Sequence, residues 1–378
     1  MRIGIDGLPL TESLAGIGHY TFELSQHLAQ TEEDEVDVIS PKPFQHSVIS
    51  RSTNTPFRLT QVKSGVLSRY WWTIGLPRHL RKTAVDIFHG TNFEIPLQNV
   101  CPSVLTIHDL SLLLFPKTHE RRRVWRARLR LPLMVRRATM IITDSDSVKN
   151  EIELYLKVPE TKIVRVYLAS RKVFQPMSAE QTKDIRERLA VRENFLLCAG
   201  TLEPRKNLQM LIQAFEEVTR AGAQPLQLVL AGQRGWLFSD LEKHLRTSAA
   251  SANVLMTGHI SDEELCALYS SCKAFIYPSI YEGFGLPPLE AMACGAPVIA
   301  SRIPSVTEVL GSAALLVPPT SPLELTQALR ELLKNEALRQ ELSAAGRKRA
   351  TLFSWAATAA QTREVYQEAI NRYERSKD

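Results

Sequence analysis

Two glutamates lie eight positions apart in the segment YPSIYEGFGLPPLEAMACGAPVIAS, which covers residues 277–301. Glu282 precedes a Gly-Phe-Gly turn, and Glu290 falls in the first turn of the short helix that Pro287 and Pro288 predict. Glycines let a backbone approach a ligand closely, and the free N–H groups at a helix start attract anions. The segment therefore predicts a phosphate site, with Glu290 accepting hydrogen bonds from hydroxyls of the phosphate's carrier and Glu282 reaching further into the site.

This carboxylate pair has two other interpretations. Glu290 alone could stabilise the helix dipole. The pair could also be that of a glycosidase, in which the carboxyls lie about 5–5.5 Å apart in retaining enzymes and about 6.5–9.5 Å apart in inverting ones. The spacing along the chain does not determine the distance between the two carboxyls. Two acids on one loop–helix unit nevertheless suit ligand binding better than they suit a glycosidase pair.

Two adjacent cations, Arg205 and Lys206, lie in a second segment, CAGTLEPRKNLQMLIQAF, residues 198–215. They follow an expected strand and directly precede the start of a helix, which is an arrangement that neutralises a diphosphate. Neighbouring cations are also common on protein surfaces. Their place after a strand, in the same half of the chain as Glu282, favours the diphosphate role.

The segment SVLTIHDLS, residues 103–111, places His108 and Asp109 at the end of an apolar strand. A lone histidine at such a place is often structural, but a titratable pair directly after a buried strand favours an active-site role. His89 and Asn92 follow another strand and are candidates for contacts with an acceptor.

Two patterns suggest dinucleotide or metal chemistry only weakly. Gly16 and Gly18 precede a helix, but Thr21 occupies the third glycine position of a dinucleotide fingerprint, so a flexible loop near the donor phosphates is the better interpretation. Asp144 and Asp146 form a short D-x-D pattern that can bind a divalent metal, but both residues precede a helix and also suit N-cap positions. We therefore expect no metal site.

The elements that position these residues alternate between short apolar runs and helix-length segments along the 378 residues. Strands are expected at 2–6, 35–40, 85–89, 103–108, 140–143 and 162–166, and then at 195–200, 226–232, 253–258, 274–279, 297–301 and 313–318. Helices are expected at 17–30, 69–82, 120–138, 145–155, 207–221, 238–250, 261–271, 287–294, 321–349 and 354–375.

Continuous Val/Ile/Leu strands separated by helices indicate parallel sheets that are covered on both faces, so the fold class is α/β. Two such series predict two doubly wound, Rossmann-like domains that face one another across a cleft, where the active site would lie. The polar stretch 168–185 suggests the join between them. We expect domains at 1–175 and 176–355, and a final helix at 356–378 that crosses back to the first domain.

The positive charge of the chain, +6 overall, is concentrated in residues 119–137, which carry eight arginines and one glutamate. The segment could be a solvated helix face, or a basic helix on anionic lipid headgroups with an apolar side formed by Trp125, Leu129, Leu131, Leu133 and Met134. No recognised nucleic-acid motif accompanies the arginines, so no nucleic-acid partner is expected. The five scattered cysteines and the lack of a signal-like start or a long apolar run favour the cytoplasm.

The E-x7-E arrangement EGFGLPPLE followed by AMACGAPVIAS resembles the hallmark of glycosyltransferase family 4, retaining nucleotide-sugar enzymes with the GT-B fold. The resemblance extends over essentially the whole chain and includes the family's G-x-x-x-x-R-K-N pattern at Arg205 and Lys206. It implies catalytic roles for His108, Asp109, Arg205, Lys206 and Glu282. It implies donor contacts from Gly16, Gly18, Arg205, Lys206, His259, Ile260, Glu282, Gly283, Phe284, Gly285, Leu286 and Glu290.

The resemblance is strongest to bacterial mannosyltransferases of O-antigen and other surface polysaccharides. It implies transfer of mannose from GDP-mannose to a lipid-linked oligosaccharide, with no metal or other cofactor, by an enzyme peripheral to the inner face of the plasma membrane. Use of a UDP-sugar donor, a GT-B-fold epimerase that acts on the nucleotide sugar, and a non-catalytic membrane scaffold remain alternatives.

Overall fold

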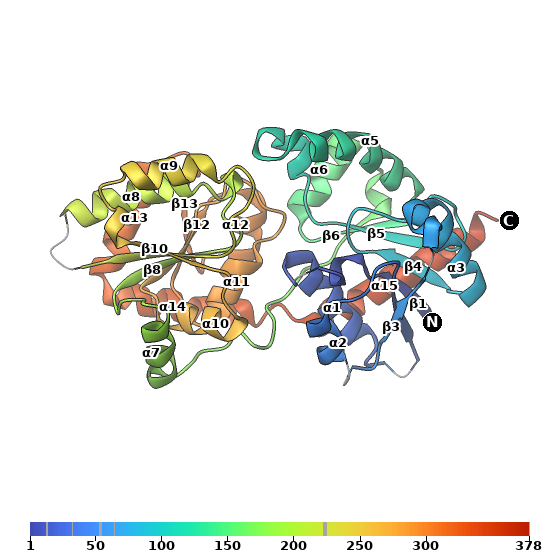
Figure 1. The fold of residues 1–378 in the computed structure, drawn as a ribbon, viewed down its shortest axis with the longest axis horizontal. Helices are drawn as coiled ribbons and strands as arrows, with labels where there is room; N and C mark the ends of the chain where they lie inside the picture. Colours follow the sequence, from blue (N-terminus) through green and yellow to red (C-terminus); the bar gives the residue numbers. More distant parts are fainter. Residues whose placement is uncertain (13, 32, 53–54, 64, 222–224, 378) are drawn as a thin grey trace. The chain divides into compact units, whose positions relative to one another are not determined.

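The computed structural model of the protein describes residues 1–12, 14–31, 33–52, 55–63, 65–221 and 225–377 (Figure 1). These residues form two compact units. Unit 1 comprises Met1–Leu110, Trp125–Leu168 and Ser354–Asp378, and unit 2 comprises Ser111–Val124 and Ala169–Phe353. The inclusion of Ser111–Val124 in unit 2 was not anticipated from the sequence.

Unit 1 is built on a parallel sheet of seven strands in the order β3-β2-β1-β4-β5-β6-β7. The strands are β1 Arg2–Asp6, β2 Glu35–Ser40, β3 Arg58–Gln61, β4 Ile87–Gly90, β5 Ser103–Ile107, β6 Met140–Thr143 and β7 Ile163–Arg165. The central strands β4, β5 and β6 are buried along their whole length, as expected for a parallel sheet with helices on both faces.

The helices of unit 1 come from both ends of the chain. They are α1 Gly16–Leu28, α2 His46–Ser52, α3 Leu76–Thr83, most of α5 Arg121–Arg137, α6 Asp146–Leu156 and α15 Trp355–Arg375. Short helical turns are η1 Leu8–Leu10, η2 Gly65–Tyr70, the π-helix η3 Trp71–Gly75 and η5 Glu160–Lys162. The last helix, α15, packs against α1 and the strands β4, β5 and β6, so the C-terminal segment belongs to the first unit (Figure 1).

Unit 2 has a parallel sheet of six strands in the order β10-β9-β8-β11-β12-β13. The strands are β8 Phe195–Ala199, β9 Gln227–Ala231, β10 Val254–Gly258, β11 Ala274–Tyr277, β12 Val298–Ser301 and β13 Leu315–Val317. Its helices and turns are α4 Ser111–Leu114, η4 Pro116–Thr118, α7 Ala179–Arg188, η6 Pro204–Lys206, α8 Leu208–Ala221, α9 Ser239–Thr247, η7 Ser251–Asn253, α10 Asp262–Ser271, α11 Leu286–Ala293, α12 Pro304–Leu310, α13 Pro322–Lys334 and α14 Glu336–Ala350.

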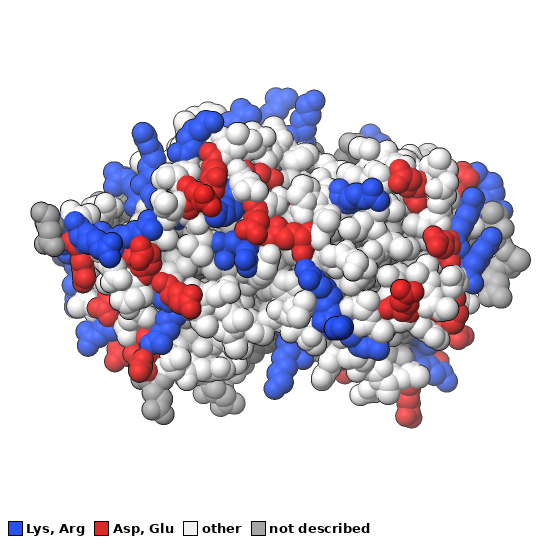
Figure 2. Space-filling model, turned by 180° about the vertical axis from the view of Figure 1, so that it is seen from behind, with Lys and Arg blue, Asp and Glu red and all other residues white. Residues whose placement is uncertain are grey.

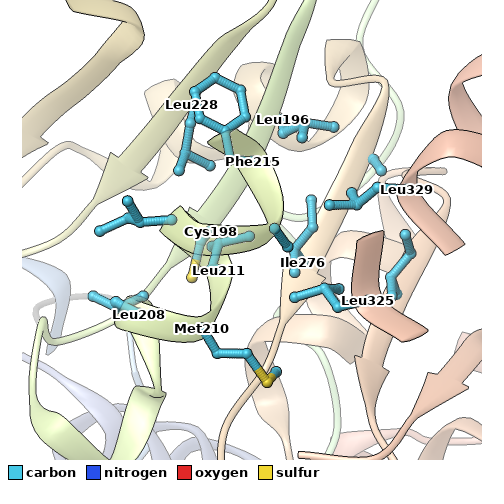
Figure 3. Close-up of a cluster of buried hydrophobic side chains, with 14 of the residues drawn as sticks. Leu196, Cys198, Leu208, Met210, Leu211, Phe215, Leu228, Ile276, Leu325 and Leu329 are labelled. Carbon is cyan, nitrogen blue, oxygen red and sulfur yellow. The ribbon is translucent and has the colours of Figure 1, made fainter. Parts of the chain in front are cut away.

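The core of unit 2 holds the sheet against α8 and α13. Phe215 and Leu211 from α8 and Leu325 from α13 pack with Leu196 and Ile276 of the sheet, and all five are fully buried (Figure 3). Because packed cores of this kind resist small displacements, the loops at the strand ends start from fixed positions.

Two glycines permit a close approach of the chain at the carboxyl ends of β8 and β9. A side chain at Gly232 would place its Cβ atom 2.0 Å from the carbonyl oxygen of Gly200. Gly200 and Gly232 also have φ values of +130° and +146°, which glycine adopts without strain. The loop that leaves β8 can therefore turn sharply into η6, which carries Arg205 and Lys206.

Several predicted elements differ from the observed ones. The edge strand β3, the short helices α2 and α12 and the helix α7 were not predicted, and α7 lies partly inside the polar stretch 168–185 that suggested the join between the domains. The helix expected at 321–349 is two helices, because Asn335 ends α13 and caps the start of α14. The expected helix 69–82 begins in the last two residues of η2 and continues as the π-helix η3 before it becomes α3.

Candidate active site

The two segments that the sequence singled out in unit 2 lie side by side. The loop after β8 is tied to the loop after β11 by a backbone hydrogen bond from Ile280 N–H to the Arg205 carbonyl, at 2.9 Å. Asn207, which has φ +55°, donates from its amide to the carbonyls of Pro278 and Pro319, at 3.1 and 2.8 Å. These bonds hold η6 against the Glu282 loop.

Lys206 is buried at the centre of this arrangement. Its Nζ atom donates to a carboxylate oxygen of Glu282 at 2.7 Å and to the hydroxyl of Tyr277 at 3.0 Å, and it lies 4.7 Å from the centre of the Tyr277 ring. Lys206 is only 8% exposed, and a buried ammonium group needs a partner of opposite charge, which the Glu282 carboxylate provides.

Arg205 makes a second set of contacts with the same carboxylate. Its guanidinium donates to Glu282 at 2.7 Å, to the Tyr281 carbonyl at 2.9 Å and twice to Glu203, at 2.7 and 3.0 Å. Glu203 was not among the predicted residues, although an acid two positions before an Arg-Lys pair could have suggested it. The cluster of Glu203, Arg205, Lys206 and Glu282 thus holds two cations and two carboxylates, which we call the charged cluster.

The charged cluster keeps Glu282 ionised. Burial alone would raise the pKa of Glu282, but the charges of Arg205 and Lys206 outweigh it and lower the pKa to about 2. Both cations are held in place before any ligand arrives, which is how enzymes prepare for charge that develops in a reaction. Chemically, the cluster suits a ligand whose negative charge grows, such as a departing diphosphate.

The turn after Glu282 leads into α11 as predicted. Gly285 is the N-cap of α11 with φ +105°, a conformation that glycine tolerates best, and Leu286 is the first helical residue. The Glu282 carbonyl accepts a hydrogen bond from Ser305 at 2.5 Å, and the Phe284 ring packs edge-to-face on Phe353. These contacts fix the Gly283–Gly285 turn, whose backbone N–H groups are the ones predicted to contact a sugar or diphosphate.

Glu290 is the fifth residue of α11 and so lies beyond the first turn, where it was predicted. It lies next to Arg171, a residue that was not predicted from the sequence. The Arg171 guanidinium binds both oxygens of Asp262, at 2.6 and 2.9 Å, and its Nε lies 3.8 Å from Glu290. The Phe174 ring covers the guanidinium at 4.8 Å. Burial raises the pKa of Glu290 to about 7, although the charge of Arg171 opposes the rise. The only sequence signal for Arg171 was a basic residue in the stretch between the two expected domains.

His259 and Ile260, two of the predicted donor contacts, follow β10 and precede α10. His259 is exposed and Ile260 is partly exposed. Ser261 is the N-cap of α10 and forms a capping box with Glu264, and Asp262 in the first turn of the helix pairs with Arg171.

In unit 1, His108 is held by both of its ring nitrogens. Nδ1 lies 2.7 Å from the Asp144 carboxylate, and Nε2 lies 3.0 Å from the Thr91 carbonyl. Both partners are acceptors, so the ring donates twice and is favoured as an imidazolium. Burial lowers the pKa of His108, but the Asp144 carboxylate, together with the Thr91 carbonyl and the charge of Asp109, more than compensates, so the net pKa is raised. The neighbouring Asp109 is partly exposed.

The two aspartates of the D-x-D pattern have separate partners. Asp144 is buried against His108, whereas Asp146 lies in the first turn of α6 and faces Arg165 at 3.6 Å. Ser145 between them is the N-cap of α6 and accepts from the Val148 N–H. Among the described residues, no group of three His, Cys, Asp or Glu side chains is arranged to hold a metal ion.

The glycine pair expected near the donor phosphates forms the start of α1. Gly16 is its first residue, exposed with φ +25°, and Gly18 is buried in the first turn. A Cβ atom at Gly18 would lie 3.0 Å from the Pro9 carbonyl oxygen, so packing accounts for the glycine there. Gly18 therefore lies in a helix and not in a flexible loop.

His89, the candidate acceptor contact, is fully buried inside unit 1. Its Nδ1 lies 2.7 Å from the hydroxyl of Tyr366 on α15, and its Nε2 lies 2.7 Å from the hydroxyl of Thr106. Burial lowers the pKa of His89 to about 3. The interpretation of His89 as an acceptor contact was wrong, because it joins α15 to the sheet.

The arginine-rich segment forms α5, but two of its expected outward residues face inward. Leu131 and Met134 are 6% and 0% exposed and pack in the core, whereas Trp125, Leu129 and Leu133 are 67%, 57% and 40% exposed. The last three residues follow one another at four-residue spacing and share one side of the helix, which we call the outer ridge. Basic side chains gather along the edge of the molecule that α5 forms (Figure 2).

The described residues contain no helix that is both long and apolar enough to span a membrane.

The two units, each built on a parallel sheet of the Rossmann-like type, define a protein of the GT-B fold class. Comparison with solved structures supports the fold: sucrose-phosphate synthase from Thermosynechococcus elongatus superposes with a TM-score of 0.77 over 97% of this chain and 98% of that one, at 23% identity. Residues 14–169 match the family described as Glycosyltransferase Family 4, and residues 179–349 match glycosyl transferases group 1.

Relatives align along nearly the whole chain. The O-antigen chain mannosyltransferase B of Escherichia coli is 30% identical over 97% of this chain and 99% of its own length. The MMP alpha-(1->4)-mannosyltransferase of Mycolicibacterium hassiacum is 29% identical over 98% of this chain and 99% of its own length. The chain belongs to glycosyltransferase family 4, and its activity is that of a glycosyltransferase.

Proposed function

We propose that the protein transfers mannose from GDP-mannose to a lipid-linked oligosaccharide during the synthesis of a bacterial surface polysaccharide. The observation that carries the proposal is the charged cluster, in which Arg205 and Lys206 are held 2.7 Å from Glu282 at the start of the turn into α11. The choice of mannose is supported by the names of the two relatives, which align with this chain from end to end.

In the proposed reaction, the bond between the sugar and the nucleoside diphosphate breaks while negative charge grows on the diphosphate. Arg205, Lys206 and the N–H groups at the start of α11 stabilise that charge. The protein's own cations perform this role, so the proposal assigns no metal ion or other cofactor to the reaction. Glu282 contacts the sugar, and Glu290 accepts hydrogen bonds from the ribose hydroxyls.

We assign retention of the anomeric configuration to attack by the acceptor on the face that the diphosphate leaves. In this scheme the departing phosphate takes the proton of the acceptor hydroxyl. His108 and Asp109 of unit 1 are assigned contacts with the reacting sugar and the acceptor. Because both nitrogens of His108 already donate, a contact from Nε2 to a sugar would replace its bond to the Thr91 carbonyl.

The proposed acceptor is anchored in a membrane, and the outer ridge of α5 suits an anionic membrane surface. Trp125, Leu129 and Leu133 supply exposed apolar area, while Arg122, Arg126 and Arg136 are exposed on the same helix. Apolar residues flanked by arginines are typical of helices that lie in the headgroup layer. We therefore place the enzyme at the cytoplasmic face of the plasma membrane.

A panel of nucleotide sugars tests the proposal. GDP-mannose with a lipid-linked oligosaccharide should release GDP, and UDP-glucose and UDP-N-acetylglucosamine should release little UDP. Preferred turnover of a UDP-sugar would overturn the donor assignment but keep the enzyme class. Conversion of the donor without any acceptor would instead identify an epimerase.

A further inference from the structure

A pocket of about 550 Å³ lies in unit 1 between the C-terminal half of α5 and the residues that follow α6. Its apolar lining includes Pro132, Val135 and Leu156, and its polar lining consists of Arg136, Lys157 and Lys162. Every lining residue is described, and none of them is acidic. The volume is within the range of small-ligand sites, about 300–1,000 Å³.

The three cations around this pocket have few partners of opposite charge. The Lys162 ammonium donates to the Arg136 carbonyl at the end of α5, at 3.0 Å. The nearby Glu160 lies outside the lining and pairs with Lys149 at 2.9 Å. Burial and the charge of Arg372 both lower the pKa of Lys162. A bound anion would relieve this concentration of positive charge.

Lys157 occupies a position where glycine is the usual residue. It ends α6 in the left-handed conformation, with φ +55°, which is strained for residues with a side chain. Lys157, an exposed residue, therefore lines the pocket at a cost in backbone energy. Strained residues of this kind are frequent at binding sites.

The neighbourhood of the pocket suits a lipid better than a free ion. Pro132 and Arg136 of the lining lie on α5 within one turn of Leu129 and Leu133 of the outer ridge. A free phosphate would leave this apolar surface in water, whereas a phospholipid would cover it with its chains. The phosphodiester of the lipid would then contact Arg136, Lys157 and Lys162.

We infer that this pocket binds the phosphodiester headgroup of one anionic bilayer phospholipid, such as phosphatidylglycerol. The site is distinct from the donor site in unit 2, and the inference rests on the membrane association in the proposed function. It predicts a defined headgroup contact in addition to the general attraction between basic side chains and a charged surface.

The first test measures flotation of the protein with vesicles of phosphatidylcholine alone and with phosphatidylglycerol added. The Arg136→Gln/Lys157→Gln variant is compared with Arg121→Gln/Arg128→Gln, which removes two exposed charges of α5 outside the pocket. Lys162 is kept because it binds the end of α5. General attraction predicts equal losses, whereas a headgroup site predicts a loss on the order of tenfold greater for the pocket variant. Equal losses would overturn the inference.

The second test uses soluble probes and calorimetry, so that it needs no membrane, donor or acceptor. Monomeric dihexanoyl-phosphatidylglycerol should bind the wild type saturably, and its binding should be lost in the pocket variant. Dihexanoyl-phosphatidylcholine should bind much more weakly. Inorganic phosphate binding as tightly as the lipid, or no saturable lipid binding, would overturn the inference. If either of these results is obtained but the wild-type protein still floats with anionic vesicles, the proposed membrane association remains supported. Thermal unfolding that is unchanged in both variants excludes misfolding.

Discussion

The carboxylate of Glu282 shares its two oxygens between Lys206 and Arg205, each at 2.7 Å. Because one carboxylate binds both cations that we assign to the diphosphate, the protein and its ligand compete for the same positive charge. This competition sets the direction of the first prediction.

The Glu282→Gln variant should bind GDP more tightly than the wild type and transfer sugar more slowly. Removing one negative charge beside the cations strengthens their attraction for the diphosphate by about tenfold, whereas the lost sugar contact lowers turnover by about 100-fold or more. Calorimetry and a GDP-release assay measure the two effects. The exposed Glu263→Gln change in the same unit serves as the control for net charge. Weaker binding of GDP by Glu282→Gln would contradict the competition.

Binding of the ribose should depend on the protonation of Glu290. Its pKa is about 7, so the carboxylate that accepts ribose hydroxyls forms as the pH rises through 7, and GDP should bind more tightly at pH 8 than at pH 6. Glu290→Gln should remove this dependence. Pyrophosphate, which has no ribose, controls for titration of the phosphates. A GDP affinity with the same pH profile in wild type and Glu290→Gln would rule out this role.

Arg171 should act as a positioning residue for Glu290. Its charge opposes the burial that raises the pKa of Glu290, so Arg171→Gln should shift the midpoint of GDP binding to a higher pH. Arg171→Lys keeps the charge and should restore the midpoint in part. A profile that stays in place while the protein only becomes less stable would indicate a purely structural role.

His108 should titrate above the usual range in the wild type and at a lower pH in Asp144→Asn. The Asp144 carboxylate is the largest of the groups that raise the pKa of His108 against the effect of burial, so its removal should lower that pKa. Histidine NMR titration measures both values. The sign also fixes the effect on stability: the contribution of the protonated ring is full below its unfolded pKa and is lost as the pH rises through the folded value. A wild-type His108 that titrates below 6.5 would contradict this account.

The hydroxyl of Tyr366 should matter for the stability of unit 1. Tyr366→Phe leaves Nδ1 of the buried His89 without its partner, which costs about 1–3 kcal/mol in the free energy of unfolding. Tyr373→Phe on the same helix removes an exposed hydrogen bond to the Asn99 carbonyl and should change stability by less than about 0.5 kcal/mol. Equal effects in denaturant unfolding would count against the buried network.

Much of this architecture follows from local sequence signals. Continuous apolar runs correctly predicted the buried strands. Glycines and prolines that follow a strand correctly predicted the turn into α11. The edge strand β3, with the sequence RLTQ, was missed because three of its four residues are polar and none of the four is fully buried. Which side of α5 faces the core also depends on tertiary packing, so Leu131 and Met134 were assigned to the wrong side.

The candidate site was predictable to a similar extent. Arg205, Lys206 and Glu282 carry a pattern in type and spacing, and the structure brings them within hydrogen-bond distance. Arg171 approaches Glu290 from more than 100 residues earlier in the chain, and its own sequence neighbourhood contains no pattern. Contacts of this kind depend on the fold and are not encoded in local spacing.

The most direct test of the donor site is single-turnover release of GDP from GDP-mannose in the presence of the lipid-linked oligosaccharide. It compares the wild type with Arg205→Ala, and thermal unfolding is measured on both. The loss of a cation that stabilises the leaving diphosphate should slow release by about 100-fold or more, while the variant remains folded. An Arg205→Ala enzyme that releases GDP at nearly the wild-type rate would contradict the account.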